Sequence, residues 1–407
     1  MNEIKRLLAI ITLFACSLPY LQAQCSYNVS KGYYVDANGK PCSNSIITAV
    51  PFLRIAPDAR GGSMGDAGVA LTPDANSQHY NSSKLAWVND KLGISATYSP
   101  WLRSIGLQDV FLAYLAGYAK IGKNQTLGFD MKYLSLGDIQ FTNDNAEPLG
   151  TGRPNEFELS LSYNRKLSDN FAAGVTGRFI NSNLAAGQRV DNVDIKAGVA
   201  GAADVSFTYK NKVGVRKDDV QVGLAISNLG NKISYTPNVS DFLPQNLGLG
   251  ILYNMNIDDY NMFAITVDVN KLLVPTPQFD DNGFYKDEDG NAIADHREGS
   301  PVSALFKSFG DAPGGFSEEI RELAYSAGLE YWYNKQFAIR AGYFYENKTK
   351  GGRNYATVGI GLKYNVFGIN LSYLVPTTNN RNPLDNTLRF SIMYTLSNET
   401  DAAPSDL

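Results

Sequence analysis

Strict alternation between apolar and polar or small residues constrains this 407-residue chain more than any other feature. In residues 388–396, LRFSIMYTL, every second side chain is apolar or aromatic, and most of the side chains between them are polar. The same alternation appears in residues 337–346, 220–227 and 157–164. A period of two residues is the geometry of a β-strand, whose successive side chains point to opposite faces. The chain is therefore predicted to be all-β.

Fourteen alternating segments can be traced between residues 91 and 396. Most are about 9–12 residues long, which is the length that a tilted strand needs to cross a bilayer. Strands of soluble sandwiches and propellers are usually shorter, about 5–6 residues. The strand length, the even count and the tyrosines at segment ends favour a 14-stranded antiparallel transmembrane β-barrel. The strands are expected to begin near residues 91, 110, 125, 156, 170, 193, 220, 245, 260, 323, 336, 354, 366 and 386.

The links between these segments alternate between short and long. Short links follow the second, fourth, eighth, tenth and twelfth segments, and the link after the sixth, residues 210–219, is of intermediate length. Long links follow the third, seventh, ninth and thirteenth segments, at residues 137–155, 230–244, 274–322 and 376–385. Outer-membrane barrels have short periplasmic turns and longer extracellular loops. We therefore expect a multi-pass outer-membrane protein whose two termini lie in the periplasm.

Charged residues of both signs occupy positions on the inward face of the predicted strands. Because a charge in a closed lumen needs a partner, these residues are expected to pair across the lumen or to hold a plug there. They are Asp130, Lys132, Arg178, Lys196, Asp204, Asp268, Glu330, Arg340, Lys363 and Arg389.

Residues 1–23 have the pattern of a secretory signal peptide, with Lys5 and Arg6 before a short apolar run. A lipoprotein signal cleaved before Cys16 is the alternative. Cys25 and Cys42 remain after cleavage at residue 23, and an oxidising compartment makes them candidates for a disulfide. Residues 24–90 are then an N-terminal segment with a hatch, residues 91–396 the barrel, and residues 397–407 a flexible periplasmic tail.

The composition argues against a nucleic-acid partner, since the formal net charge is −4 and such a partner requires a basic surface. No cofactor or metal site is predicted either. The acids in residues 280–289 fail the calcium-loop pattern, because the sixth position of a loop starting at Asp287 is Ala292 rather than glycine.

Residues 61–65, GGSMG, match the G-x-S-x-G pattern of a serine hydrolase. A nucleophile elbow needs a strand before the serine and a helix after it, whereas glycines and Pro57 surround this one. The chain has only two histidines, His79 and His296, and neither falls on a predicted strand. We therefore interpret Gly61, Gly62, Gly65 and Gly68 as the turn of a plug whose backbone passes tightly through a filled lumen. The chain is not expected to be an enzyme.

The longest link mixes acids with aromatic side chains, a composition that is common where a loop meets another protein. Packing of this loop over the barrel mouth is an equally good explanation. Trp101 and Leu102, in the first outer loop, form a second candidate contact, for which an aromatic belt at the membrane interface is the alternative. The candidate contacts in the longest link are Phe279, Asp280, Asp281, Phe284, Tyr285, Phe309 and Phe316.

Two resemblances concern the N-terminal segment. The four glycines, followed by DAN at residues 74–76 and YNS at residues 80–82, resemble the start of FadL-like transporters of long-chain fatty acids. That family has fourteen strands and an N-terminal hatch folded into the lumen. Residues 52–70, FLRIAPDARGGSMGDAGVA, more closely resemble the start of the PorV (LptO) and PorQ family of the type IX secretion system.

The second resemblance implies an outer-membrane secretion component. Such a protein receives cargo from an outer-membrane translocon of the SprA/Sov kind and binds the conserved C-terminal domain of that cargo. It then carries the cargo to a PorU-like surface attachment complex, while outer-membrane lipids surround its barrel. The alternative, from the first resemblance, is an outer-membrane transporter of hydrophobic small molecules, with a lateral opening permitted by inward glycines such as Gly198 and Gly223.

Overall fold

The computed structural model describes residues 26–28, 33–35, 44–103, 106–142, 145, 147–190, 193–237, 239–280, 283–291, 293–377 and 386–397. The predicted signal peptide, Cys25, Cys42, Asp281 and residues 398–407 of the predicted tail lie outside these ranges. Within the described ranges, no helix is long and apolar enough to cross a membrane.

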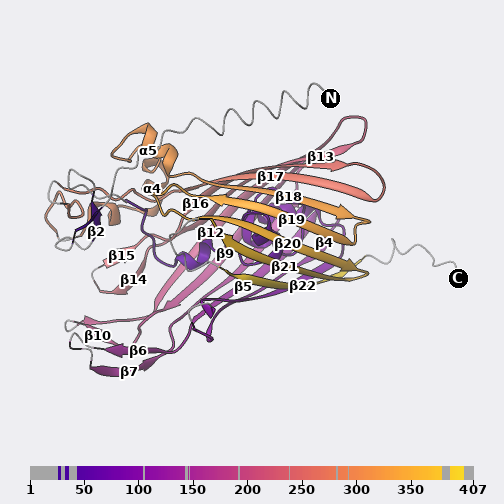
Figure 1. Ribbon diagram of the computed structural model, residues 1–407. Helices are drawn as coiled ribbons and strands as arrows, with labels where there is room; N and C mark the ends of the chain where they lie inside the picture. The colour runs from indigo at the N-terminus through magenta and orange to yellow at the C-terminus, as the bar shows by residue number, and fades with distance from the viewer. Residues whose placement is uncertain are drawn as a thin grey trace.

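Fourteen antiparallel strands form a closed barrel, as the alternation predicts (Figure 1). The last strand pairs with the first, from Phe390 opposite Tyr98 to Leu396 opposite Leu92, so the sheet has no free edge. The strands are β3 (Leu92–Pro100), β4 (Val110–Gly122), β5 (Gln125–Leu136), β8 (Asn155–Lys166), β9 (Phe171–Asn183), β12 (Gly198–Val213), β13 (Asp218–Gly230), β16 (Asn246–Asn256), β17 (Asn261–Leu272), β18 (Ala324–Tyr333), β19 (Phe337–Tyr345), β20 (Asn354–Tyr364), β21 (Phe367–Pro376) and β22 (Leu388–Leu396).

The sixth strand is where the sequence prediction was wrong. Residues near 193 belong to a small hairpin, β10 (Arg189–Val190) with β11 (Val193–Asp194), and β12 begins only at Gly198. Lys196 therefore lies outside the barrel strands. At its other end β12 continues to Val213, and the link to β13 is residues 214–217 rather than 210–219. Polar residues such as Lys210 and Lys212 still pair through their backbones, so side-chain alternation does not reveal this extension.

The barrel wall is exposed on its apolar face and buried on its polar face. In β8, Leu161 is 73% exposed, whereas the neighbouring Ser160 is 3% exposed. This distribution is the reverse of a soluble protein and is expected where lipid covers the outside of the wall.

The long links carry their own short elements, which gather at one end of the barrel (Figure 1). Three are hairpins, namely β10–β11, β6 (Ile139–Thr142) with β7 (Pro148–Gly152), and β14 (Ile233–Thr236) with β15 (Val239–Asp241). The link after β17 holds η4 (Asp295–Arg297), α4 (Pro301–Lys307) and α5 (Phe316–Arg321). The first described pair of strands, β1 (Ser26–Asn28) and β2 (Tyr33–Val35), lies at the same end.

Residues 49–88, here called the lumen segment, lie inside the barrel and bond to strands around its wall (Figure 1). The segment contains η1 (Pro51–Arg54), α2 (Ala59–Ser63), α3 (Ser77–Tyr80) and η2 (Ser82–Trp87). Its backbone amides donate to inward side chains of distant strands. Ala59 N donates to Ser391 Oγ of β22 at 2.9 Å, and Gly65 N donates to Thr357 Oγ1 of β20 at 2.9 Å. On the opposite side, Ser83 N donates to Ser206 Oγ of β12 at 3.0 Å.

The inward charges of the strands hold the lumen segment, as the sequence predicts. Glu330 of β18 accepts from Arg60 Nη2 at 2.8 Å and from Arg340 Nε of β19 at 2.6 Å. Arg60 also pairs with Asp74 at 3.0 Å, which closes the turn of the segment around it. Lys132 Nζ donates to the carbonyl of Leu53 at 3.1 Å. On the far wall the pairing is between strands, with Arg178 of β9 bonded to Glu158 and Asp204.

The four glycines of the predicted turn occupy places with no room for a side chain. Gly65 has a φ of +69°, and a Cβ atom there would lie 2.5 Å from the carbonyl oxygen of Tyr343 in the wall. A Cβ at Gly62 would meet Arg389 at 2.6 Å, and one at Gly61 or Gly68 would meet Tyr80. The positive φ belongs to Gly65 alone among the four, while the other three permit close packing.

Gly65→Ala is expected to loosen the lumen segment, because it adds left-handed strain of about 1–3 kcal/mol and a backbone clash. Limited proteolysis of the purified barrel should then cut within residues 49–88 much faster than in the wild type. Gly214→Ala is the matched control, since Gly214 has a φ of +70° and open space around its Cβ position. If residues 49–88 resisted proteolysis equally in Gly65→Ala and Gly214→Ala, the close packing assigned to Gly65 would be wrong.

Candidate partner-binding surface

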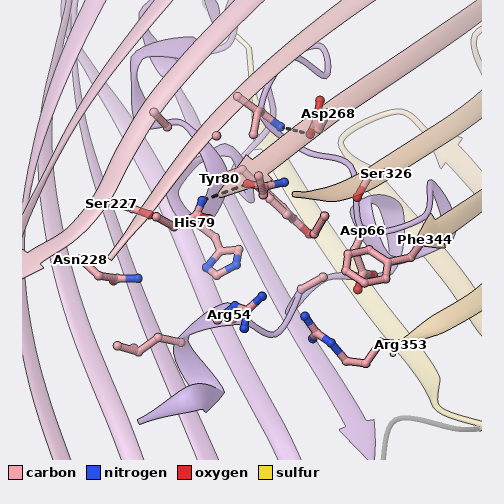
Figure 2. A pocket seen from close by; sticks show the side chains of 18 of the residues that line it. Arg54, Asp66, His79, Tyr80, Ser227, Asn228, Asp268, Ser326, Phe344 and Arg353 are labelled. Atoms are coloured by element: carbon pink, nitrogen blue, oxygen red, sulfur yellow. Dashed lines mark hydrogen bonds between the residues drawn. The ribbon is translucent and has the colours of Figure 1, made fainter. Parts of the chain in front are cut away.

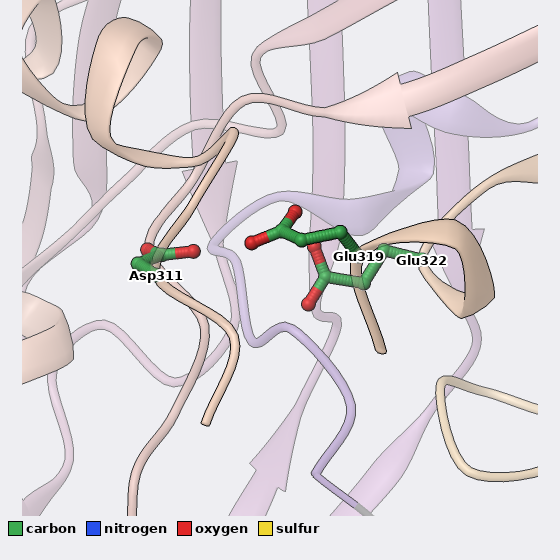
Figure 3. A group of neighbouring side chains, drawn as sticks. All are labelled: Asp311, Glu319 and Glu322. Carbon is green, nitrogen blue, oxygen red and sulfur yellow. The ribbon is translucent and has the colours of Figure 1, made fainter. Parts of the chain in front are cut away.

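The longest link, residues 273–323, is fixed to the barrel rim by a buried cluster of charges at α5. Lys271, at the end of β17, donates to Glu319 at 2.9 Å and to Glu322 at 2.7 Å. Thr276 adds a hydroxyl bond to Glu322 at 2.6 Å. Figure 3 shows Glu319 and Glu322 side by side, with Asp311 facing them from the preceding turn.

Lys350 extends this cluster to a second link of the barrel. Its ammonium donates to Glu318 at 2.6 Å and to Glu322 at 3.0 Å, so Glu322 accepts from two lysines on different strand pairs. Asn44, just before the lumen segment, donates to Glu318 at 2.6 Å. Burial would raise the pKa of Glu318, but its bonds to Lys350 and Asn44 outweigh burial and lower that pKa. The cluster thus joins three separate parts of the chain and makes α5 a fixed platform.

Asp311, Glu319 and Glu322 are also the residues best placed to hold a metal, because their carboxylate atoms lie within 4.8 Å of one another. Each of them already has a partner. Lys271 bonds to Glu319 and Glu322, and Asp311 accepts from Thr276 N at 3.0 Å. A metal ion would have to displace Lys271, so the arrangement is that of a loop anchor. The sequence drew attention to the acids of residues 280–289 instead, because this cluster forms only when α5 meets β17.

An aromatic stack supports the tip of the same link. Phe279 forms a β-bridge with Tyr285, and their rings stack with centroids 5.0 Å apart. Tyr285 in turn contacts His296, with ring centroids 4.9 Å apart. The side chain of Asp280 accepts from Phe284 N at 2.8 Å and closes the turn. The predicted contacts Phe279, Asp280, Phe284 and Tyr285 therefore belong to one ordered hairpin.

Several large apolar side chains of this link are exposed on its outer side. Phe316 is 80% exposed, Phe284 66%, Phe309 54% and Tyr285 45%. Val302 and Phe306 of α4 are exposed as well and lie one helical turn apart, as do Phe316 and Ile320 of α5. Val302, Phe306 and Ile320 were not among the predicted contacts. The i, i+4 spacing after the helix-starting Ser300-Pro301 pair is the signal that reveals them.

Trp101 and Leu102 lie in a different environment. Trp101 is 7% exposed and packs in an apolar cluster with Phe52 and Leu53 of the lumen segment, while Leu102 packs against the same cluster. The pair thus covers the outer side of the lumen segment. This position leaves Trp101 little surface for a partner.

A small cavity lies between the lumen segment and the barrel wall (Figure 2). It has a volume of about 100 Å³ and is lined by side chains that include Arg54, Arg353 and Asp66. Most of its charged groups are already paired. Arg353 donates to Glu346 at 2.8 Å, and Asp66 accepts from Tyr355 at 2.6 Å. Part of its wall is apolar, with Val69 and Phe344 in it, but its volume has room for only a few water molecules.

Ser63 lies deep in the lumen segment and has no catalytic surroundings. It is fully buried in α2, and its hydroxyl donates to the carbonyl of Arg60 at 2.8 Å. His79 faces Lys132 instead, at 3.3 Å. The G-x-S-x-G pattern therefore marks a tight helical turn.

Glu322→Gln is expected to loosen α5, because each of two buried lysines loses one of its two carboxylate partners, a loss of about 1–3 kcal/mol. Hydrogen exchange measured by mass spectrometry should rise across residues 300–322 while the barrel strands stay protected. The control is Glu288→Gln in the same link, whose pair with Lys286 is exposed and contributes little. The anchor assignment fails if both variants exchange like the wild type.

Acid is expected to loosen the aromatic hairpin. Burial, followed by the nearby Arg297 charge, lowers the pKa of His296 from 6.5 to about 4, although Asp295 opposes the shift. The folded link then binds fewer protons than the unfolded one, so its stability falls as the pH drops from 6.5 towards 4. Hydrogen exchange of residues 279–297 should speed up between those limits beyond its intrinsic pH dependence. His296→Phe should abolish this extra change, and a persisting change would implicate another group.

Comparison with solved structures supports the fold. The TodX deltaS2S3 mutant monoaromatic hydrocarbon channel matches with a TM-score of 0.50 and 11% identity over 84% of this chain and 99% of that chain. The Ralstonia pickettii toluene transporter TbuX gives 0.47 and 12% over 85% and 99%. A Pseudomonas aeruginosa FadL homologue gives 0.43 and 10% over 87% and 99%. At such identities the likeness concerns the barrel fold alone.

Among curated proteins, none matches the chain. The family model described as type IX secretion system protein PorV matches residues 38–279, which is more than half of the sequence. The match includes the lumen segment and nine of the fourteen barrel strands. This outer-membrane β-barrel therefore belongs to the PorV family of the type IX secretion system.

Proposed function

We propose that this barrel captures secreted cargo through the exposed face of its longest link. The observation that carries the proposal is the group of exposed aromatic residues Phe284, Tyr285, Phe309 and Phe316 on a link that is fixed to the rim. A surface of this kind loses little conformational entropy on binding, because the anchor has already ordered it. Large aromatic side chains are also the residues that dominate protein–protein binding energy.

The proposed partner is the C-terminal domain of secreted cargo, received at an outer-membrane translocon of the SprA/Sov kind. The barrel then passes the cargo to a PorU-like surface attachment complex. The protein acts in this scheme as a binding component without catalysis. Membership of the PorV family supports the secretion role.

We place the long links outside the cell and the end of the last strand in the periplasm. The first described residues, 26–28 and 33–35, lie at the end of the long links, so the expected periplasmic N-terminus does not fit this orientation. The strand ends at the short turns, such as residues 214–217 and 257–260, lie at the same end as the last residue of β22. Short turns at the periplasmic side are the rule for outer-membrane barrels. We further propose that the N-terminal residues 24–90 act as a hatch that keeps the lumen closed while cargo binds outside.

A transporter of hydrophobic small molecules has less support. Its lateral opening was expected at Gly198 and Gly223, but a Cβ at Gly223 would meet the carbonyl of Val69, and one at Gly198 would meet Ile233. These glycines therefore make room for the lumen segment and for the β14 hairpin. Gly223 is paired on both sides, with Thr208 and Gly250, whereas Gly198 is paired only with Ser182 of β9, because the pairing of β12 with β13 begins at Ala202.

The test is a mild-detergent pull-down of the tagged protein with Phe284, Phe309 and Phe316 all changed to Ser. Loss of three exposed aromatic anchors should lower the recovery of exported proteins that share a C-terminal domain by about tenfold or more. Quantitative mass spectrometry of the retained proteins measures this loss. The barrel should remain folded, since none of the three side chains is in its wall.

The matched control changes Val215, Ile257 and Tyr260 to Ser. These three are also exposed apolar residues, but they lie in the short turns at the opposite end. Full cargo recovery with the first variant would refute the assigned surface. Equal loss in the control would show that the effect comes from general surface apolarity. Recovery of the wild-type barrel with bound fatty acids and without exported proteins would favour the transporter.

A further inference from the structure

A second cavity lies inside the barrel at the end of the short turns, opposite the links that bind cargo in the proposal above. Its volume is about 330 Å³, which falls in the range of small-ligand pockets. Residues 72–75 of the lumen segment form one side of it. Side chains of β17 to β22, with Tyr118 of β4 and the link residues Asp90, Lys335 and Val366, form the rest.

Arg340 offers an unused hydrogen-bond donor at this cavity. Its side chain is fully buried, with Nε bonded to Glu330 at 2.6 Å and Nη1 bonded to Asn370 at 2.8 Å. Its Nη2 atom is buried and has no hydrogen-bond partner among the described residues. A buried guanidinium nitrogen without a partner is costly, and an acceptor placed in the cavity would satisfy it.

The charged side chains at the cavity have a net charge of +1, which one negative charge on a ligand would balance. Four cations surround it, Arg60, Arg340, Lys335 and Lys363. Three acids oppose them, since Asp74 and Asp90 line the cavity and Glu330 bonds to both arginines. The difference, four minus three, is one positive charge. Neither Lys335 nor Lys363 has an ion-pair partner within the described part of the chain, and Lys363 lies on β20, the strand that pairs with β19 and its Arg340.

The remaining wall is apolar, and its methionine side chains can adapt to the shape of a ligand. Trp332 lies over the Arg340 guanidinium, with 5.3 Å between the ring centroid and Cζ. Met262, Met393 and Tyr118 line the cavity with it. Methionine side chains adapt to irregular apolar shapes, and an indole presents a large flat face. A ligand would thus meet an apolar surface on one side and two cationic groups, Arg340 and Lys363, on the other.

We infer that this cavity binds a small apolar monoanion, such as a carboxylate on an aromatic or aliphatic body, that enters from the short-turn end. The carboxylate lies between Arg340 Nη2 and the Lys363 ammonium, and the apolar body lies against Trp332 and the two methionines. The site is separated from the cargo-binding face by the lumen segment. It is therefore a second binding function of the barrel and does not depend on cargo capture.

The experiment is equilibrium dialysis of 4-phenylbutyrate against the full barrel in lipid nanodiscs, with empty nanodiscs to subtract partitioning into lipid. Saturable binding of one molecule per barrel is expected. The neutral 4-phenylbutanol and the cationic 4-phenylbutylamine have the same apolar body and should bind about tenfold more weakly or worse, since they lack the carboxylate that Arg340 and Lys363 recognise.

Lys363→Glu should weaken binding of 4-phenylbutyrate by about tenfold or more. The control Lys123→Glu makes the same change of charge in a short turn at the same end, away from the cavity, and should leave affinity unchanged. Trp332→Leu tests the apolar wall by a second route and should also weaken binding. Both lysines are exposed, so folding is preserved, and heat-dependent mobility on gels verifies it.

Three results would overturn the assignment. One is the absence of saturable uptake above that of empty nanodiscs. A second is equal binding of the alcohol and the acid. The third is equal loss of affinity in Lys363→Glu and Lys123→Glu, which would indicate a general surface effect. Binding of an acidic aromatic peptide without binding of 4-phenylbutyrate would replace the small ligand with a protein partner.

Discussion

The lumen of this barrel is organised around Glu330. This carboxylate accepts hydrogen bonds from Arg60 of the lumen segment and from Arg340 of the wall, so one acid joins the contents of the barrel to its strand. A buried ion pair adds little stability relative to an apolar core, but it is favourable only when its atoms lie in the correct geometry. With Arg60 fixed, Asp74 and the turn between them are fixed as well, and the four glycines can pack against the wall. The lumen segment therefore has one position in which its charges are satisfied.

That position divides the barrel into two ends with different chemistry. At the end of the long links, apolar surface is displayed on α4, α5 and the aromatic hairpin. At the end of the short turns, a cavity beside Trp332 combines apolar side chains with cations at its edge. A fixed outer platform suits a large partner, whereas a cavity suits a small one. The lumen segment lies between these two surfaces.

The strands could be predicted well because every second side chain of a barrel strand faces lipid, so the alternation appears along the whole strand. Thirteen of the fourteen strand starts lie within two residues of their predicted positions. The sixth failed because β12 runs beyond the apolar band at one end, and because Val193 imitates its start at the other. The sequence could not predict the partner of each inward charged residue, because that partner depends on which strands the lumen segment contacts. Residues such as Asn44, Glu318 and Lys350 are far apart in sequence and meet only in the folded chain.

The longest link, which carries α5, forms few hydrogen bonds with the N-terminal part of the chain inside the barrel. A force on α5 would therefore act mainly on other parts of the structure. Asn44 donates to Glu318, but the other bonds of the α5 anchor run to Lys271 and Lys350, which belong to the barrel and its rim. The lumen segment is held by Glu330, Asp268 and serines of the wall. A pull on α5 is therefore resisted by β17 and by the link after β19 before it reaches the lumen. Both sets of bonds reach β17, through Lys271 for α5 and through Asp268 for the lumen segment, so this strand carries the outer platform and the contents of the lumen together.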